Sequence, residues 1–245
     1  MLELASLFYY FGEKIYINQI QKNSKINGRL LNAKKIKMDK EIKLASIRCV
    51  KENERRIIDE IASIHLKTFP GFFLSFMGHG FLKQMYCSYC EHVSSGVLVA
   101  EENDKVVGFL AYSSDYSGLY KYMIRRHLCL FAWYSMGAFI RRPSAFMHII
   151  KAFLKPREVK RKEEYVELSS IGVDPDFKSK GVGTQLIDKL KEIVDFSRYK
   201  YITLETDAVD NEVAIKFYKK NNFVVERMYE TSEKRKMYEF RYRYN

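Results

Sequence analysis

The sequence predicts an α/β fold in which short β-strands and amphipathic helices alternate along the chain. Two β-rich runs, 96–102 and 105–112, flank Asn103 and Asp104, a dipeptide that favours a two-residue hairpin turn. Apolar residues recur at helical spacing in segments that lie between such runs. A third observation is the β-rich run 164–173, which leads through a glycine-containing loop directly into a helical pattern. A chain of 245 residues can form one domain with a full core, or two small domains.

The expected elements follow one another with short connections. The clearest helical pattern comes after the first strand, where Ile57, Ile61 and Ile64 fall on one face. Asp210 and Asn211 are typical N-cap residues and open the last helix. The expected strands are 44–50, 96–102, 105–112, 164–173, 199–206, 222–230 and 235–244, and the expected helices outside the insert described below are 52–69, 72–91, 180–196 and 210–218.

The positive charge of the chain is concentrated in two segments. There are 42 Lys and Arg against 30 Asp and Glu, which gives a net charge of +12. Residues 121–162 carry +10 and residues 1–37 carry +5, so the rest of the chain is slightly acidic. A local excess of this kind is typical of contact with nucleic acid, with an anionic membrane surface or with an anionic small ligand.

The composition also divides the chain into an extension and a domain. Residues 1–37 are rich in Lys, Asn and Ile and have poor periodicity, whereas a regular pattern begins after Met38. We therefore expect 1–37 to be an N-terminal extension and 38–245 to form the domain; an N-terminal helix packed on the domain is the alternative. Residues 116–162 interrupt the alternation of strands and helices, which predicts a helical insert.

The insert contains the longest nearly apolar run of the chain, residues 128–140. This run is shorter than the ~20 residues that a membrane-spanning helix needs. Pro143 stands where a second helix would begin, and apolar residues at helical spacing follow it. The N-terminus shows no secretory signal, and the four cysteines show no disulfide framework. We therefore expect a cytoplasmic protein.

The clearest chemical signal is the loop that joins the strand 164–173 to the helix 180–196. Glycines let a ligand approach the backbone closely, and free N–H groups at the start of a helix favour an anion. The spacing lacks the third glycine of a dinucleotide motif and the Gly-Lys-Ser/Thr ending of a P-loop. We predict a diphosphate site here, with a turn that only caps the helix as the alternative. The loop consists of Lys178, Ser179, Lys180, Gly181, Val182, Gly183 and Thr184.

Two segments resemble motifs of a known family. The segment SSIGVDPDFKSKGVGTQLI resembles motif A of the GNAT superfamily of acyl-CoA N-acyltransferases, and NEVAIKFYKKNNF resembles its motif B. The two motifs lie within residues 165–225. The resemblance implies a GNAT-like α/β fold: a mixed, mostly antiparallel central sheet flanked by helices, with the helical insert between the third and fourth strands. One departure is Lys178, which stands where the family usually has Gln or Arg.

The resemblance implies acetyl-CoA as the co-substrate. The backbone of Ile171, Gly172 and Val173 would pair with the pantetheine arm, as an added strand would. The amides of 179–184 would hold the diphosphate. Asn211, at the start of the motif B helix, would contact the cofactor arm; a role as N-cap is the alternative, and the two roles can coexist.

The resemblance further implies direct attack of an amine on the thioester, which requires a base and an acid. Tyr218 matches the motif B tyrosine and would be the general acid; a core aromatic is the alternative. Glu167 lies where some family members place a general base, acting directly or through water. Strict alternation would put Tyr165, Glu167, Ser169 and Ile171 on one face of the strand. For Glu167, the alternatives are a solvated glutamate and an ion pair with the basic insert.

The charge of the insert bears on the acceptor. Eleven Lys and Arg within 121–162 would repel a polycation, so we expect a small-molecule amine with an anionic group, such as a nucleotide-linked amino sugar. No spacing of histidines or cysteines predicts a metal site. Two other classes stay open: a nucleic-acid-binding module and a peripheral membrane protein, both using residues 120–162. We expect no nucleic-acid partner, because the aromatics follow helical core spacing, and weak membrane contact would run through 125–142.

Overall fold

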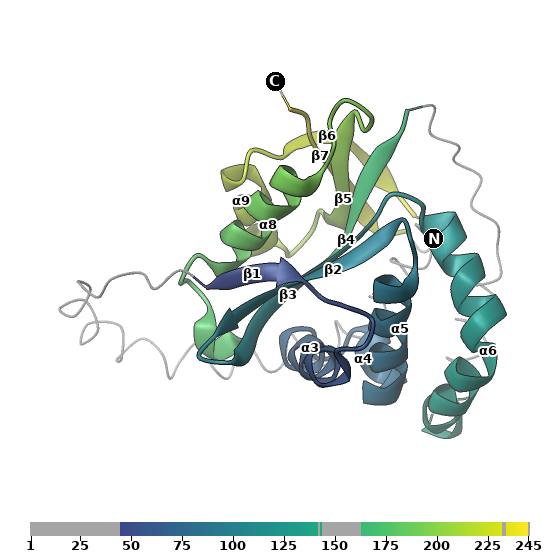
Figure 1. The fold of residues 1–245 in the computed structure, drawn as a ribbon. Helices are drawn as coiled ribbons and strands as arrows, with labels where there is room; N and C mark the ends of the chain where they lie inside the picture. Colours follow the sequence, from purple (N-terminus) through teal and green to yellow (C-terminus); the bar gives the residue numbers. More distant parts are fainter. Residues whose placement is uncertain (1–44, 142, 144–162, 232–233, 245) are drawn as a thin grey trace, which may run out of the picture.

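The structure is a computed structural model that describes residues 45–141, 143, 163–231 and 234–244 (Figure 1). Its centre is a seven-stranded sheet with the strand order β1-β2-β3-β4-β5-β7-β6. All neighbouring strands are antiparallel except β4 and β5, so the predicted mixed, mostly antiparallel sheet is confirmed. The strands are β1 (Ser46–Cys49), β2 (Ser95–Glu102), β3 (Lys105–Ser113), β4 (Tyr165–Val173), β5 (Tyr201–Asp207), β6 (Val224–Glu230) and β7 (Lys236–Tyr242).

The hairpin predicted from Asn103 and Asp104 joins β2 to β3. Both residues have positive φ, 51° and 60°, as the two central positions of a type I′ turn require. The register pairs Glu102 with Lys105 directly across this turn. The hairpin prediction is therefore confirmed to the residue.

Four helices of the described chain lie on one side of the sheet (Figure 1). The helices α3 and α5 pack on β2 and β3, whereas α6 lies outside them, on α4 and α5. Their core is fully buried at Ile61, Leu82, Tyr86 and Phe109. The four helices are α3 (Arg55–Thr68), α4 (Phe73–Met77), α5 (His79–Glu91) and α6 (Tyr116–Arg141).

Two helices, α8 (Val182–Ile193) and α9 (Glu212–Lys220), contribute to a second core on the opposite side. Leu186, Ile187 and Leu190 of α8 are fully buried against β2, β3 and β4. A short 3-10 turn, η1 (Pro175–Phe177), connects the end of β4 to the loop before α8. The helices predicted after β4 and β5 thus both form.

One prediction about a helix is wrong. Residues 72–91 form two helices rather than one, because Gly78 has a φ of +94° that separates α4 from α5. In the insert, the apolar run 128–140 is part of one continuous helix, α6, that starts at Tyr116. The second helix expected after Pro143 lies outside the described residues, as does the N-terminal extension 1–37. The insert does lie between the third and fourth strands, as predicted.

Candidate active site

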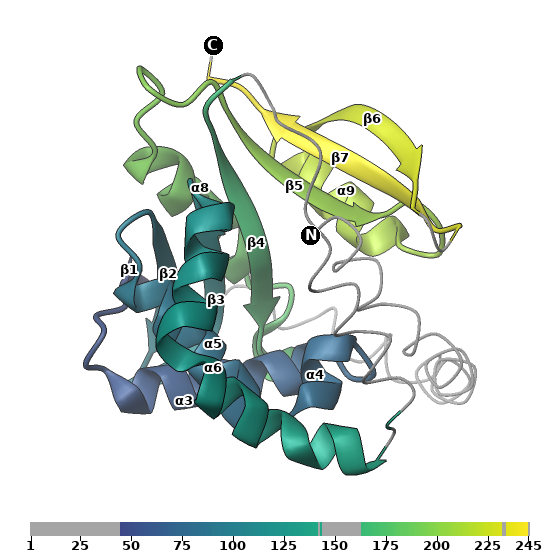
Figure 2. The ribbon, with the colours of Figure 1, turned by 90° about the vertical axis from the view of Figure 1, so that its right-hand side faces the viewer.

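The sheet splits between its central strands, β4 and β5. They pair only where Tyr165, Val166 and Glu167 lie opposite Tyr201–Thr203. Beyond Glu167, β4 continues to Val173 paired with β3, while β5 continues paired with β7. Figure 2 shows the two strands diverging from this point. The edge of β4 that lines the split therefore offers backbone groups to which no described strand is paired, as an extended ligand would require.

A β-bulge lies in β4 next to this split. Leu168 and Ser170 are opposite consecutive residues of β3, so Ser169 between them is an extra residue. Before the bulge, the even-numbered Leu168 packs in the core beneath α8. After the bulge, the odd-numbered Ile171 packs on this same side of the sheet. The predicted alternation, which placed Glu167, Ser169 and Ile171 on one face, is therefore wrong. Glu167 and Ile171 lie on opposite sides of the sheet.

Glu167 lies at the vertex of the split. It is the last residue of β4 paired with β5, next to Thr203, and Ser113 of β3 is its other neighbour. Its charge acts on Tyr89 of α5: burial raises the pKa of this tyrosine well above its ordinary value, and Glu167 adds to the shift. Tyr89 in turn donates a hydrogen bond of 3.2 Å to the hydroxyl of Tyr116. The half-buried carboxylate of Glu167 thus lies near tyrosines, on the helix side that carries α3 to α6.

At the other end of β4, the predicted diphosphate loop has an unusual backbone. Ser179 and Gly181 both have positive φ, 66° and 80°. Alternating backbone conformations of this kind turn neighbouring N–H groups toward one point and form an anion-binding concavity. No side chain caps α8. The first-turn amides of Val182, Gly183 and Thr184 consequently have no acceptor within the described part of the chain.

Several segments meet at this loop. Lys178 and Lys180 are exposed on it, and the Nζ of Lys180 lies 4.3 Å from the centre of the Phe177 ring. Helix α9 comes very close, since a Cβ placed on Gly183 would lie 3.0 Å from the ring of Phe217. The structure therefore brings motif A and motif B together beside the end of β4.

Tyr218 follows Phe217 on α9 and packs among aromatic rings. Its ring centroid lies 6.1 Å from that of Phe223 and 5.8 Å from that of Phe240. Burial raises the pKa of Tyr218 to about 12, so the phenol keeps its proton at neutral pH. No described residue forms a hydrogen bond with its hydroxyl group. Tyr218 is therefore a partly buried aromatic residue whose protonated hydroxyl is free to donate a hydrogen bond to a ligand.

Two further residues of the predicted cofactor site already have partners. The amide nitrogen of Asn211 donates to Thr206 Oγ1 at 2.6 Å and to the carbonyl of Asp207 at 3.2 Å. Asn211 occupies the N-cap position of α9, but its side chain makes no capping hydrogen bond. It fastens the start of α9 to the end of β5 instead. The carbonyl of Val173 accepts a hydrogen bond of 3.2 Å from the hydroxyl of Thr68.

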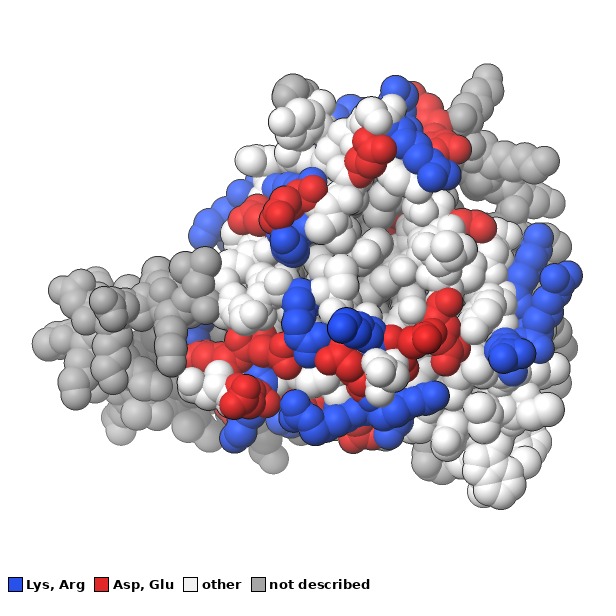
Figure 3. Space-filling model, in the orientation of Figure 1, with Lys and Arg blue, Asp and Glu red and all other residues white. Residues whose placement is uncertain are grey.

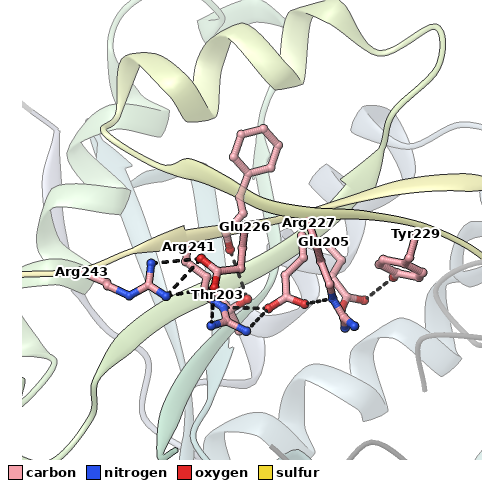
Figure 4. A network of polar contacts seen from close by, with 9 residues as sticks. Thr203, Glu205, Glu226, Arg227, Tyr229, Arg241 and Arg243 are labelled. Carbon is pink, nitrogen blue, oxygen red and sulfur yellow. Dashed lines mark hydrogen bonds and ion pairs between the residues drawn. The ribbon is translucent and has the colours of Figure 1, made fainter.

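A polar wall on β5, β7 and β6 was not predicted (Figure 4). Glu239 is fully buried and receives hydrogen bonds from Arg227 at 2.7 Å and Arg241 at 2.8 Å. Tyr229 donates to Glu205 at 3.0 Å. Alternation along β5 places Glu205 on the same face as Thr203, and hence as Glu167. The alternating acids and threonines of the β5 sequence could have indicated this wall.

The described ranges contain no group of three or more His, Cys, Asp or Glu side chains arranged to hold a metal ion. Cys87 is buried and Cys90 half-buried on α5, and burial raises the pKa of both thiols. High pKa values keep such thiols protonated and therefore unreactive.

The fold, the split and the amide-lined loop define the class of acyl-CoA-dependent acyltransferases, and a comparison of sequences identifies the family. The profile of the acetyltransferase (GNAT) family matches residues 58–223. This match covers more than half of the chain, and the protein therefore belongs to the GNAT family of acetyltransferases.

Individual relatives agree with this assignment. An uncharacterised N-acetyltransferase of Methanocaldococcus jannaschii is 40% identical over 62 residues, which is 25% of this chain and only 27% of the relative's length. A GNAT-family protein of Desulfovibrio desulfuricans has a similar fold, with a TM-score of 0.52 and 12% identity over 81% of this chain and 98% of that one. A GNAT acetyltransferase of Bacillus cereus gives a TM-score of 0.51 and 12% identity over 82% and 99%. At such low identity, these two structures establish the fold alone.

Proposed function

We propose that the protein transfers an acetyl group from acetyl-CoA to a primary amine by direct attack. The observation that carries this proposal is the split between β4 and β5, which has Glu167 at its vertex and the unpaired amides of α8 at its open end. Family membership supplies the class of reaction, and the split supplies the geometry that such a reaction needs.

Acetyl-CoA fits the shape and charge of the split. Its pantetheine arm has amide groups that can pair with the edge of β4 at Ile171, Gly172 and Val173. Its diphosphate suits the concavity of 179–184, where Lys178 and Lys180 add positive charge. Because the contacts come mainly from the backbone, Lys178 can replace the usual Gln or Arg of motif A.

The chemical step needs a base that takes one proton from the amine and a group that stabilises the negative charge on the departing sulfur. The amine nitrogen attacks the thioester carbon, the C–S bond breaks, and an amide and a thiolate result. Glu167 takes the proton of the attacking amine, directly or through a water molecule. Tyr218 faces the departing sulfur as hydrogen-bond donor. The pKa of Tyr218, about 12, exceeds the pKa of ~8.5 of an ordinary thiol, so transfer of its proton to the thiolate is unfavourable. Tyr218 therefore stabilises the developing thiolate mainly by this hydrogen bond.

The helix side of the split supports a cationic amine as acceptor. Glu167 and Glu205 share this side, and Tyr89 and Tyr116 lie close to Glu167. Carboxylates and aromatic rings both favour an ammonium group. A nucleotide-linked amino sugar, with one amine and an anionic handle, remains our specific proposal. Lys121, Arg125 and Arg126 of α6 line a surface depression whose lining includes neither Glu167 nor Tyr116, so we do not assign the contact with the anionic handle to them.

A panel of amines tests the proposal. Purified protein with acetyl-CoA is offered a UDP-linked amino sugar, spermidine and a Lys-rich peptide, and release of free thiol is followed. We expect acetyl transfer, with the amino sugar the best acceptor. Preference for the polycations would overturn the anionic acceptor but keep the reaction, whereas failure to transfer to any amine, despite CoA binding, would count against the reaction itself.

Substitution of Glu167 tests the base. We expect Glu167→Gln to lower turnover at pH 7 by about 10²–10⁴-fold, the usual contribution of acid–base catalysis. The deficit should shrink as the pH rises toward the pKa of the amine, because solution then supplies the neutral nucleophile. A pH profile of turnover for both proteins provides the measurement. A deficit that stays constant from pH 7 to 10 would instead indicate a structural role for Glu167.

A further inference from the structure

The outer surface of α6 is unusually apolar. Of the fourteen large apolar side chains exposed in the described chain, seven lie on α6. Trp133 is 71% and Ile140 is 73% exposed. Apolar patches of this extent mark a surface that contacts a partner or a membrane. The group consists of Leu128, Leu130, Trp133, Tyr134, Met136, Phe139 and Ile140.

Positively charged side chains extend the apolar surface of α6 toward the start of the helix. Steps of three or four residues run along the outside of α6 from Lys121 and Arg125 to Trp133, Met136 and Ile140, so these side chains form one ridge. In Figure 3, cations gather at the right-hand edge of the molecule, where Figure 1 places α6, and uncharged surface lies below them. The helix therefore presents a basic half and an apolar half in the same direction.

The opposite side of α6 is fixed to α5. His127 lies 2.7 Å from the carboxylate of Glu91, and the ring of Phe131 lies 4.9 Å from that of Phe81. These contacts hold the helix in place and turn the ridge outward. The ridge is thus a rigid feature of the fold.

The basic half of the ridge borders an open depression of about 500 Å³. Three cations line it, Lys121, Arg125 and Arg126, together with His92, Gly118 and Tyr122. Within the described ranges, none of the three cations takes part in an ion pair. The carboxylates nearby are engaged: Glu91 with His127 and Tyr122, and Asp115 with the amide of Gly118. An anionic group can therefore bind these cations without displacing a partner that belongs to the described residues.

We propose that this ridge docks the enzyme on an anionic membrane surface, with lipid phosphates at Lys121, Arg125 and Arg126 and with Trp133, Met136 and Ile140 in the interface. Anionic lipids attract such cations, and apolar side chains on the same helix enter the boundary of the acyl chains. Tryptophan favours this depth because its ring is amphipathic. No helix among the described residues is long and apolar enough to cross a membrane, so the contact lies along the surface.

Two other occupants fit less well. A nucleic acid would satisfy the cations but would leave Met136 and Ile140 in water. A second copy of the chain would bring two sets of Lys121, Arg125 and Arg126 close together, where like charges repel. An anionic membrane satisfies both halves of the ridge.

Vesicle flotation of the full chain tests this proposal. We expect the protein to float with vesicles of phosphatidylcholine containing 30% phosphatidylserine, in a salt-sensitive way, and not with phosphatidylcholine alone. Arg125→Gln combined with Arg126→Gln should weaken binding about 25-fold, since each cation near the surface contributes about a factor of five. Lys105→Gln combined with Lys200→Gln, which removes the same charge elsewhere, should leave binding unchanged.

A second pair of variants tests the apolar half. Trp133→Ser combined with Ile140→Ser should reduce flotation at least about tenfold, because the apolar surface of these two side chains is then no longer available for burial in the membrane. The control combines Val93→Ser with Val213→Ser. These two valines lie outside the ridge, and they are 96% and 85% exposed. Equal binding to neutral and anionic vesicles, no flotation, or unaffected flotation of both ridge variants would overturn the proposal. Tighter binding to DNA or RNA than to vesicles, or a dimer abolished by the Trp133 and Ile140 variant, would overturn it in favour of the other occupants. Acetyl transfer to a soluble amine should be unchanged in every variant.

Discussion

Gly181→Glu is expected to abolish binding of acetyl-CoA. The new side chain would start from a backbone with φ +80°, which L residues rarely adopt, and would bring a carboxylate to the diphosphate concavity. Two like charges ~5 Å apart at an effective dielectric constant of 20 repel each other by about 3 kcal/mol. We therefore expect the Kd for acetyl-CoA, measured by calorimetry, to rise at least about 100-fold.

Gly181→Ala is the matched control for this variant. It meets the same backbone restriction, but its Cβ enters open space, with the Gln185 amide 3.8 Å away as the nearest group. It adds no charge, and we expect a loss of less than about tenfold. Thermal melting of both variants establishes that they fold. If Gly181→Glu folds and binds acetyl-CoA with wild-type affinity, the diphosphate does not bind at this loop.

Tyr218→Phe is expected to lower turnover by about 10²–10⁴-fold and to leave the Kd for acetyl-CoA nearly unchanged. The change removes the hydroxyl that, in the proposed mechanism, donates a hydrogen bond to the departing sulfur, but it keeps the ring that packs on Phe223 and Phe240. Because the pKa of Tyr218 is about 12, the phenol stays protonated below that pH. The loss of turnover should therefore be similar throughout pH 6 to 10.

A tyrosine outside the split provides the control. The Tyr199 hydroxyl donates to Ser114 at 3.1 Å, so Tyr199→Phe removes one hydrogen bond without changing the reaction centre. We expect this variant to keep wild-type turnover. Wild-type turnover in Tyr218→Phe, measured by thiol release, would exclude Tyr218 as the hydrogen-bond donor to sulfur.

Local sequence signals predicted much of the fold. The turn at Asn103 and Asp104 is decided by two residues that tolerate positive φ, and these residues behave the same way in any hairpin. The helix 180–196 and the loop before it were predicted because glycine spacing and apolar periodicity act over short distances. The observed α8 is shorter at both ends, Val182–Ile193, since helix ends depend on packing and capping.

Other features depend on contacts that a local pattern does not contain. One helix was predicted over 72–91, and only the observed φ of +94° at Gly78 shows that the chain turns there. The bulge at Ser169 arises from pairing with β3, which lies far away in the sequence. In the candidate site, the sequence pointed to Glu167 and Tyr218 through motifs. Glu205 belongs to no motif and became visible only through its register beside Glu239 and its bond to Tyr229.

The bulge at Ser169 reverses the alternation of side chains along β4. Upstream of it, odd-numbered residues such as Glu167 lie on the side of the sheet where we propose that the acceptor binds, and downstream of it the odd-numbered Ile171 lies on the side of α8. A combinatorial library that treated 165–173 as one alternating strand would randomise acceptor-side positions in its first half and core positions in its second. Redesign of acceptor preference should therefore vary Glu167 and Tyr165 together with Ser170, and leave Leu168 and Ile171 untouched.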